Sequence, residues 1–431
     1  MALKTKWLIS KEKSCSCTMP GVWRAVSYCR GCAVIFHSPR GCAHVASTMD
    51  VTSQFRDFSE GGTETMEPVP LISSDMRERD GIFGGTDRLR RCIRYTAQEK
   101  HPQCILIASS CVAGVIGDDV EAEAREAEEE LGIPVVAVNG SGFLGGEYGD
   151  GYFAAAQAVI SRFFKRCPKK AGTVLFLGDN GGPWGPDARE AGRLLSCFGL
   201  RTAGQFPGFV PFSEWDQIPS ASLSVILGGW GQASRKLEDM ADLLERDFDV
   251  PCLGHVYPIG WSGTVQWIRR VGEVTGQPGR AESLVREEES RLHQAVASMR
   301  RVTEGKTAVI GIGRSAVYYD PADTVQMLRH MGIKTKAVIF YDNVGEQDRV
   351  LYRKELEKEK DIPVLSMGDD GQKAIDGSDV LLTTHEILNI CTRQLFIPMI
   401  SPVGISGEIA FMKALYRLLC RYGRKGGMAY V

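Results

Sequence analysis

The chain has 431 residues, of which 43% are hydrophobic and 24% charged, so it can bury the cores of about two or three α/β units. Its 51 basic and 53 acidic residues give a formal net charge of -2, so no overall field draws it to nucleic acid or an anionic membrane. No run approaches the roughly 20 apolar residues that span a bilayer, and no secretory signal is visible, so we expect a cytoplasmic protein. Its 13 cysteines are then expected to be thiols or metal ligands rather than disulfides.

From about residue 80 onward, short β-branched runs alternate with amphipathic segments, which is the pattern of parallel sheets covered by helices. Strands are predicted, in chain order, at residues 104–109, 135–138, 173–180, 223–229, 307–313, 336–342, 362–368 and 379–386. Helices are predicted between them, among others at residues 121–132, 154–164, 188–198, 264–274 and 281–301.

The sequence therefore predicts an α/β fold with three Rossmann-like parallel-sheet units around a cleft, preceded by an N-terminal cysteine-rich segment. We place that segment at residues 1–80, where Cys, Gly and Pro are frequent, and expect it to be a functional cap rather than a Rossmann-type unit. The first α/β unit, which carries Cys111, is placed at 81–170, the second at 171–305 and the third at 306–431.

The densest chemical signal is CTMPGVWRAVSYCRGCAVIFHSPRGCAHV at residues 17–45, followed by IFGG at 82–85 and SSCVAGVIGDDV at 109–120. Thiolates are the natural ligands of iron–sulfur clusters, and neighbouring glycines let backbone N–H groups approach the sulfides. Cysteines at strand and loop ends can converge on one edge of the molecule. The pair Cys29-x-x-Cys32 alone would suggest a zinc or redox site, but the chain has no second CxxC. Cysteines elsewhere stand in apolar or helical contexts and are expected to pack in the core.

Taken together, these segments resemble component 1 of nitrogenase and its relatives. That family carries a first Cys before a Pro/Gly turn, a second in a His-Gly-Ser-x-Gly-Cys context, an FGG segment, and a third Cys before an Ile-Gly-Asp-Asp run. The intervals of 25 residues from Cys17 to Cys42 and 26 residues from Gly85 to Cys111 resemble those of the family's β-type chain. The resemblance continues more weakly through the middle of the sequence and so covers most of the chain.

The resemblance implies that Cys17, Cys42 and Cys111 bind iron as part of an [8Fe–7S] P-cluster, or of a [4Fe–4S] cluster, shared with a partner chain. It places Ser141 where some members have an additional oxygen ligand, although a serine there also fits an ordinary turn. Whether Cys15 also ligates, or Cys29 and Cys32 do, is left open. The implied partners are a homologous α-type subunit, in an α2β2 heterotetramer, and an ATP-hydrolysing [4Fe–4S] reductase protein.

In the family, α-type chains hold the substrate-reducing cofactor through a mid-chain Cys and a His near the C-terminus. The corresponding stretch GGWGQASRK has no cysteine here, and no histidine follows His385. The resemblance therefore implies a β-type oxidoreductase subunit that transfers electrons to a cofactor in its partner. The segment CTMPGVWRAVSYCRGC departs from the usual family sequence, which favours a nitrogenase-like enzyme such as methylthio-alkane reductase, which cleaves C–S bonds. A nitrogenase β chain that reduces dinitrogen, and a non-catalytic scaffold for cofactor maturation, are the alternatives.

Overall fold

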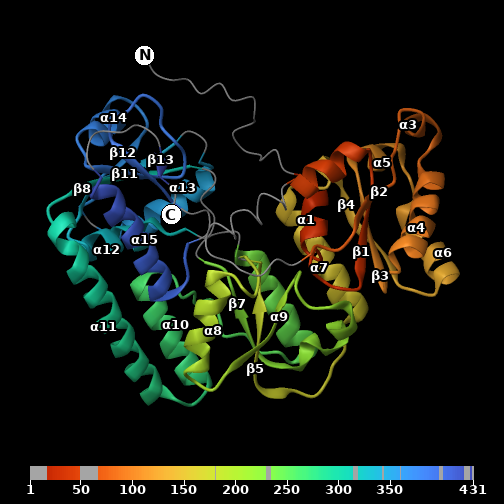
Figure 1. Ribbon diagram of the computed structural model, residues 1–431, viewed down its shortest axis with the longest axis horizontal. Helices are drawn as coiled ribbons and strands as arrows, with labels where there is room; N and C mark the ends of the chain where they lie inside the picture. Colours follow the sequence, from red (N-terminus) through yellow and green to blue (C-terminus); the bar gives the residue numbers. More distant parts are fainter. Residues whose placement is uncertain are drawn as a thin grey trace.

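The computed structural model describes residues 17–48, 67–179, 181–229, 234–313, 319–341, 344–359, 361–397, 401–421 and 428–429. Three parallel sheets, one in each α/β unit, organise the molecule, and the first and third units lie on either side of the second (Figure 1). The predicted α/β class is therefore confirmed. Within the described ranges, no helix combines the length and the apolar character needed to cross a bilayer.

The first sheet has the strand order β2-β1-β3-β4, with all neighbours parallel. Its strands are β1 (Cys32–His37), β2 (Leu71–Ser73), β3 (Cys104–Ser109) and β4 (Val135–Ser141). All six residues of β1 are buried, so both faces of the sheet need helical cover. One face packs against α1 (Thr18–Arg24) and α7 (Tyr148–Phe163), and the other against α4 (Thr86–Lys100) and α6 (Val120–Leu131).

Strands β1 and β2 correct the expectation that residues 1–80 form a cap outside the α/β units. Strand β1 lies between β2 and β3 and pairs with β3 along its whole length, from Cys32 with Cys104 to His37 with Ser109. The run CAVIFH is short, apolar and bounded by Gly31 and Ser38, which is the pattern of a fully buried strand. The N-terminal segment is thus part of the first sheet.

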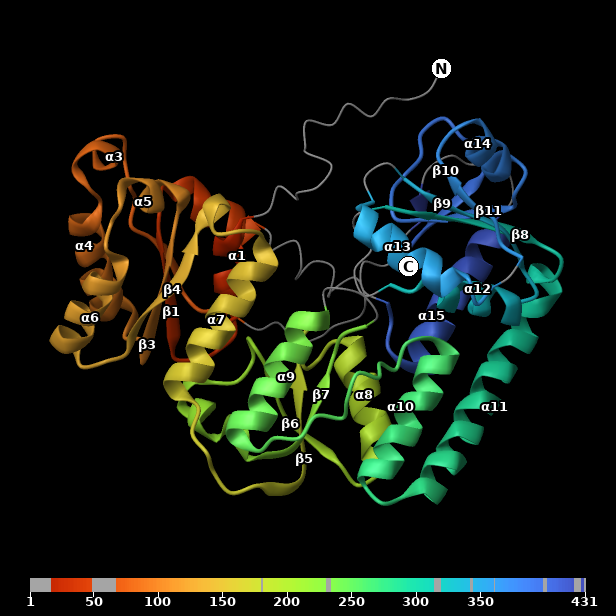
Figure 2. The same cartoon turned by 180° about the vertical axis from the view of Figure 1, so that it is seen from behind.

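The second sheet has the order β6-β5-β7, again parallel, and contains β5 (Lys170–Leu177), β6 (Arg201–Phe206) and β7 (Ala221–Ile226). A parallel bridge from Ser224 to Cys252 extends its edge beyond β7. Its helices are α8 (Pro186–Ser196), α9 (Arg235–Phe248), α10 (Gly260–Val274) and α11 (Pro278–Thr303). Seen from behind, α10 and α11 lie side by side at the end of the molecule that carries the third unit (Figure 2).

The third sheet has the order β10-β9-β8-β11-β12-β13, and every neighbouring pair is parallel. Its strands are β8 (Thr307–Ile312), β9 (Lys334–Phe340), β10 (Val364–Ser366), β11 (Val380–Thr383), β12 (Arg393–Phe396) and β13 (Met428–Ala429). Its helices are α12 (Pro321–His330), α13 (Glu346–Leu356), α14 (Asp369–Asp376) and α15 (Gly404–Leu419).

Specific contacts join the units. Arg24 of the first unit forms an ion pair with Asp179 of the second, with 2.6 Å between Nε and Oδ2. Between the second and third units, Ile259 and Val403 form an antiparallel bridge, and Gly404 donates its N–H to the carbonyl of Pro258 at 2.6 Å. The starts of α10 and α15 are thereby held together.

Candidate iron–sulfur site

The three cysteines of the sequence motif lie at the starts of three helices. Cys17 is the N-cap of α1, Cys111 is the first residue of α5 (Cys111–Ile116), and Cys42 lies in the first turn of the helical residues 40–48. The first backbone N–H groups of a helix have no partner within it and favour nearby negative charge. The N–H of Met19 interacts with the Cys17 sulfur in this way. Helix starts therefore favour thiolates, which are the form that binds metal.

The order of strands explains why these residues meet. Strands β1, β3 and β4 are parallel neighbours, so the segments that follow them begin at one edge of the first sheet. The segments after β1 and β3 carry Cys42 and Cys111, and Ser141 is the last residue of β4. Helix α1 reaches the same edge, because the Thr18 hydroxyl donates a hydrogen bond of 3.1 Å to the carbonyl of Gly142.

The three thiols are close enough to interact electrostatically. Burial raises the pKa of Cys17, and the charges of Cys42 and Cys111 raise it further. Burial also raises the pKa of Cys42, with a contribution from Cys111, while the Ser38 hydroxyl acts in the opposite direction. Each of the three cysteine residues is partly exposed.

The donor set fits a cluster better than a single ion. Over the described ranges, no group of three or more His, Cys, Asp or Glu side chains is arranged to hold one metal ion. An iron–sulfur cluster takes its thiolates on different irons, so its ligands surround a larger volume than those of a mononuclear site. Three partly buried thiols that share one edge match this chemistry.

Glycines let the Ser141 loop approach α5 closely. A Cβ at Gly114 would lie 2.7 Å from the Ser141 Cβ, and a Cβ at Gly142 would lie 2.6 Å from the Cys111 nitrogen. Gly142 also has φ +54°, a conformation that disfavours other residues. Larger side chains at these two positions would push α5 away, so the glycines help to set the position of Cys111. Ser141 itself lies beside the first turn of α5.

A buried histidine–aspartate pair, which the sequence analysis did not identify, supports this edge. His37 is fully buried, its Nδ1 lies 2.9 Å from Ser74 Oγ, and its Nε2 lies 2.8 Å from Asp118 Oδ2. Asp118 also accepts the N–H of Gly85, at 3.0 and 3.1 Å from its two oxygens. Burial lowers the pKa of His37 despite Asp118, which acts to raise it. The IFGG and IGDD motifs are thus joined through the end of β1, between the elements that carry Cys42 and Cys111.

Exposed apolar side chains surround the thiols. They belong to the same segments as the cysteines and the IFGG and Ser141 loops: Val45, Ile82, Phe83, Val112, Val115, Phe143 and Leu144. Among them, Val115 is 73% exposed and Phe83 82% exposed. A group of exposed large apolar residues is typical of a protein interaction surface. The sulfur donors therefore lie within a surface suited to a protein partner.

Cys29 and Cys32, the other described cysteines of the N-terminal segment, do not lie at this edge. Cys32 and Cys104 are register partners at the starts of β1 and β3, at the opposite edge of the sheet from Cys42 and Cys111. Cys29 is buried beside them, and burial raises its pKa to about 12. These thiols pack in the core, away from the edge that carries Cys42 and Cys111. Cys15 lies outside the described residues.

Comparisons with known proteins agree with the motif and the fold. The family model of nitrogenase component 1 type oxidoreductases matches residues 17–419. The nitrogenase iron-molybdenum cofactor biosynthesis protein NifE of Clostridium pasteurianum is 29% identical over 321 residues, covering 73% of this chain and 65% of that protein. The nitrogenase molybdenum-iron protein alpha chain of Methanosarcina barkeri is 28% identical over 307 residues, covering 70% and 55%. The alignments thus span less than two thirds of these relatives.

A solved structure, nitrogenase Cp1 at pH 5, matches with a TM-score of 0.66 and 20% identity, covering 96% of this chain and 91% of that one. At this identity the match supports the fold alone, while the family model covers the sequence from Cys17 to the end of α15. The predicted resemblance is therefore confirmed, and the chain belongs to the nitrogenase component 1 type oxidoreductase family.

Proposed function

We propose that this chain is the β-type, cluster-holding subunit of a nitrogenase-like, ATP-dependent reductase complex. One observation carries the proposal: Cys17, Cys42 and Cys111 start three helices at one sheet edge, within an exposed apolar surface. A chain that held a complete cluster alone would enclose its ligands. An open set of thiols on an apolar surface instead fits a cluster that is shared with a partner.

The three cysteines would hold the cluster, and Ser141 lies on the same edge as a possible oxygen donor. When bound, the cluster would supply one-electron transfer between the donor protein and the partner's cofactor. The helix starts would compensate the thiolate charges, and exposed residues such as Val115 and Phe143 would exclude water once a partner covers them. The partners we propose are a homologous α-type chain, in an α2β2 assembly, and an ATP-hydrolysing [4Fe–4S] reductase protein.

The sequence supports a role in electron transfer rather than in substrate reduction, because the family's ligands for the substrate-reducing cofactor have no counterparts in it. Residues 228–236 contain no cysteine, and residues 230–233 of this stretch lie outside the described chain. The next thiol, Cys252, accepts an N–H from Gly254 at 3.4 Å and lies beside β7 in the second sheet. No histidine follows His385 in the sequence. We therefore assign substrate reduction to the partner. We propose the C–S bond of a methylthio-alkane as its target, because the sequence around Cys17 differs from that of dinitrogen-reducing chains.

A maturation scaffold is the second candidate. It is favoured by the likeness to NifE, a protein named for cofactor biosynthesis, together with the missing mid-chain cysteine. An enzyme and a scaffold would use the same three thiols. They differ in what happens after loading, because a scaffold transfers its metal cargo once whereas an enzyme turns over.

The test is anaerobic purification of the full chain with its α-type partner, followed by iron and acid-labile sulfide analysis. We expect about eight irons per heterodimer at the interface, as in a cluster of the P type, in addition to any metal of the partner's own cofactor. Zinc alone, or no metal, would contradict the cluster assignment. Repeated reduction of a methylthio-alkane with the ATP-dependent donor supports the enzyme, whereas a single transfer of metal to an apo-protein supports the scaffold.

A further inference from the structure

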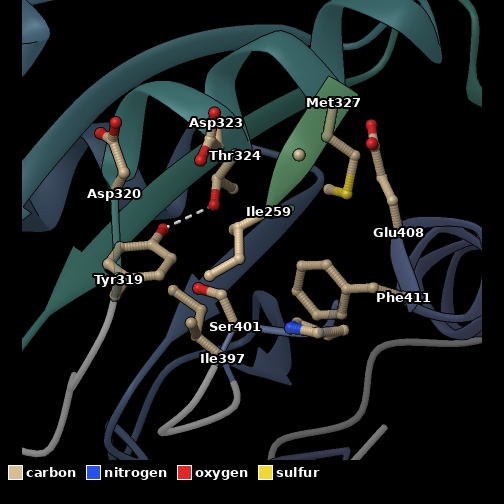
Figure 3. A pocket seen from close by; sticks show the side chains of 12 residues that line it. Ile259, Tyr319, Asp320, Asp323, Thr324, Met327, Ile397, Ser401, Glu408 and Phe411 are labelled. Carbon is tan, nitrogen blue, oxygen red and sulfur yellow. Dashed lines mark hydrogen bonds between the residues drawn. The ribbon is translucent and has the colours of Figure 1, made fainter. Parts of the chain in front are cut away.

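A small acidic cavity lies where the second and third units meet, remote in sequence from the cysteine motif. It has a volume of about 50 Å³. Its walls come from the start of α10, from α12 with the two residues before it, and from α15 with the chain leading to it. Figure 3 shows Asp320 and Asp323 on one side of this cavity and Glu408 on another, with Ile259 and Phe411 between them. Three carboxyl groups therefore border one small space.

Glu408 has an oxygen that lacks a partner. The residue is only 7% exposed, and its buried Oε2 atom forms no hydrogen bond with the described part of the chain. Its other oxygen lies 3.8 Å from His330 Nδ1, too far for a hydrogen bond, and that nitrogen is also buried without a partner there. A buried carboxylate oxygen without a donor is costly, which points to a bound group that supplies one.

No side chain of the described residues neutralises the two aspartates. Asp320 accepts the N–H of Ala322 at 2.8 Å as the N-cap of α12, but no described cation forms an ion pair with it or with Asp323. Lys358, whose charge acts to lower the pKa of both aspartates, is paired with Glu355. Burial raises the pKa of Asp320 to about 6 and that of Asp323 to about 8, and the charges of Asp320 and Glu408 add to the effect on Asp323. The cavity thus gathers three carboxyl groups, and no cation of the described chain is paired with its two aspartates.

The remaining walls restrict the kind of cation. No group of His, Cys, Asp and Glu in the described chain has an arrangement suited to a metal ion. The apolar side chains of Ile259, Met327 and Phe411 cannot replace the oxygen ligands that a metal ion requires. An ammonium group instead donates separate N–H bonds to acceptors in different directions, and an aromatic face such as that of Phe411 attracts it. The volume admits one or two groups of water size, about 30 Å³ each in the liquid.

We propose that this cavity binds a small ammonium-type cation, ammonium or methylammonium, whose N–H groups donate to Glu408 and Asp323. Bound there, the cation contacts α12 and α15 next to the Ile259–Val403 bridge, and so stabilises the junction of the second and third units. The site is independent of the thiols and of the proposed function.

The affinity for the cation should rise with pH, because carboxyl groups that are protonated in the empty cavity must ionise to accept the charge. The rise is expected from below pH 6 to above pH 8, the range set by Asp320 and Asp323. Among the described residues, the charged and titratable groups that face them are Tyr319, Tyr352, Glu355, Lys358, Glu359 and Glu408, with His330 beside Glu408.

The test is thermal unfolding of the full chain in ammonium, sodium or potassium chloride at equal ionic strength. We expect ammonium to raise the unfolding temperature, and tetramethylammonium, which has no N–H and exceeds the cavity, to have no effect. Glu408→Gln and Asp323→Asn should each weaken the ammonium response roughly tenfold. Asp323→Asn copies the neutral form of this carboxyl, so it should fold even if Glu408→Gln does not. The exposed Glu357→Gln is the matched control and should respond as the unaltered chain does.

Equal stabilisation by potassium or sodium would overturn the assignment of an N–H donor. An undiminished ammonium response in Asp323→Asn would place the site elsewhere. An affinity that falls between pH 6 and pH 8 would contradict the ionisation of Asp320 and Asp323 on binding.

Discussion

The first and third units share a parallel-sheet plan, but they differ at the edge where their strands end. In the first unit, loops at this edge carry thiols and leave large apolar side chains exposed, such as Val115 at 73%. In the described part of the third unit, the chain's own side chains occupy this edge around Gly311. The Tyr341 hydroxyl lies 2.6 Å from Thr383 Oγ1, and a Cβ at Gly311 would lie 1.9 Å from that hydroxyl.

Glycines at the carboxyl edges of the first and third sheets make room for different neighbours. In the third unit, Gly311 and Gly313 make room for Tyr341 and His385, so side chains of the chain itself occupy the space beside these glycines. In the first unit, Gly114 and Gly142 make room for a neighbouring loop, and the thiol of Cys111 stays partly exposed. The carboxyl edge of a parallel sheet is thus a place where a site can form, and the side chains that occupy it decide whether one does.

The largest expected effect comes from removing a thiol at the open edge. Cys42→Ala should abolish cluster binding, because a cluster that loses one of three thiolates from this chain loses the iron bound there. Iron analysis and electron paramagnetic resonance of the complex measure the cluster content. Cys391→Ala, at an exposed position of the third unit, and Cys197→Ala, in the second, should keep both signals. An equal loss of iron and of the resonance signal in all three variants would mean that Cys42 packs in the protein and does not bind the cluster.

The second largest expected effect comes from a charge placed on the exposed apolar surface of the first unit. Val115→Glu is expected to weaken association with the α-type partner at least about tenfold, since the buried carboxylate would lack a partner. The matched change Val350→Glu, at a residue of the third unit that is 57% exposed, should leave the assembly intact. Analytical ultracentrifugation measures the association. If Val350→Glu disrupts assembly and Val115→Glu does not, the partner surface lies on the third unit.

The smallest expected effect concerns the support beneath the cysteines. Asp118→Asn should lower the free energy of unfolding by about 1–3 kcal/mol, because it replaces charge-assisted bonds to His37 and Gly85 in a buried site. It should also speed the loss of iron to a chelator. In the third unit, Asp379 similarly accepts the N–H of Thr307, at 2.8 Å. Asp379→Asn should reduce stability without changing the rate of iron loss, and equal rates would show that Asp118 has no positioning role.

The regular elements were predictable where one apolar run forms one strand. Strand β3 has the predicted bounds, residues 104–109, because CILIAS is a continuous buried run. Strand β1 was missed because its run lies among cysteines that suggested ligation instead of packing. Strands β6 and β12, with the sequences RTAGQF and RQLF, were missed because their polar residues hide the pattern, and pairing with neighbours defines them.

For the candidate iron–sulfur site, the sequence predicted only the cysteine ligands. The thiols are carried by a local motif, and the structure brings all three to one edge, although their binding of iron stays a prediction. The support for them was not visible in the sequence, because His37 and Asp118 are 81 residues apart and meet only in the folded sheet. The acidic cavity was equally hidden, since its carboxyl groups come from two helices far apart in the chain and are arranged by the junction of two units.

The position of β1 has a consequence for the order in which the protein matures. This strand lies between Cys17 and Cys42 in the sequence and in the interior of the first sheet. A metal cannot draw the two cysteines together ahead of folding, as zinc does in small fingers, because a buried strand must first be placed between them. If these cysteines hold the cluster that we propose, iron and sulfide reach a sheet that has already formed, and the chain from iron-starved cells should be folded and free of metal.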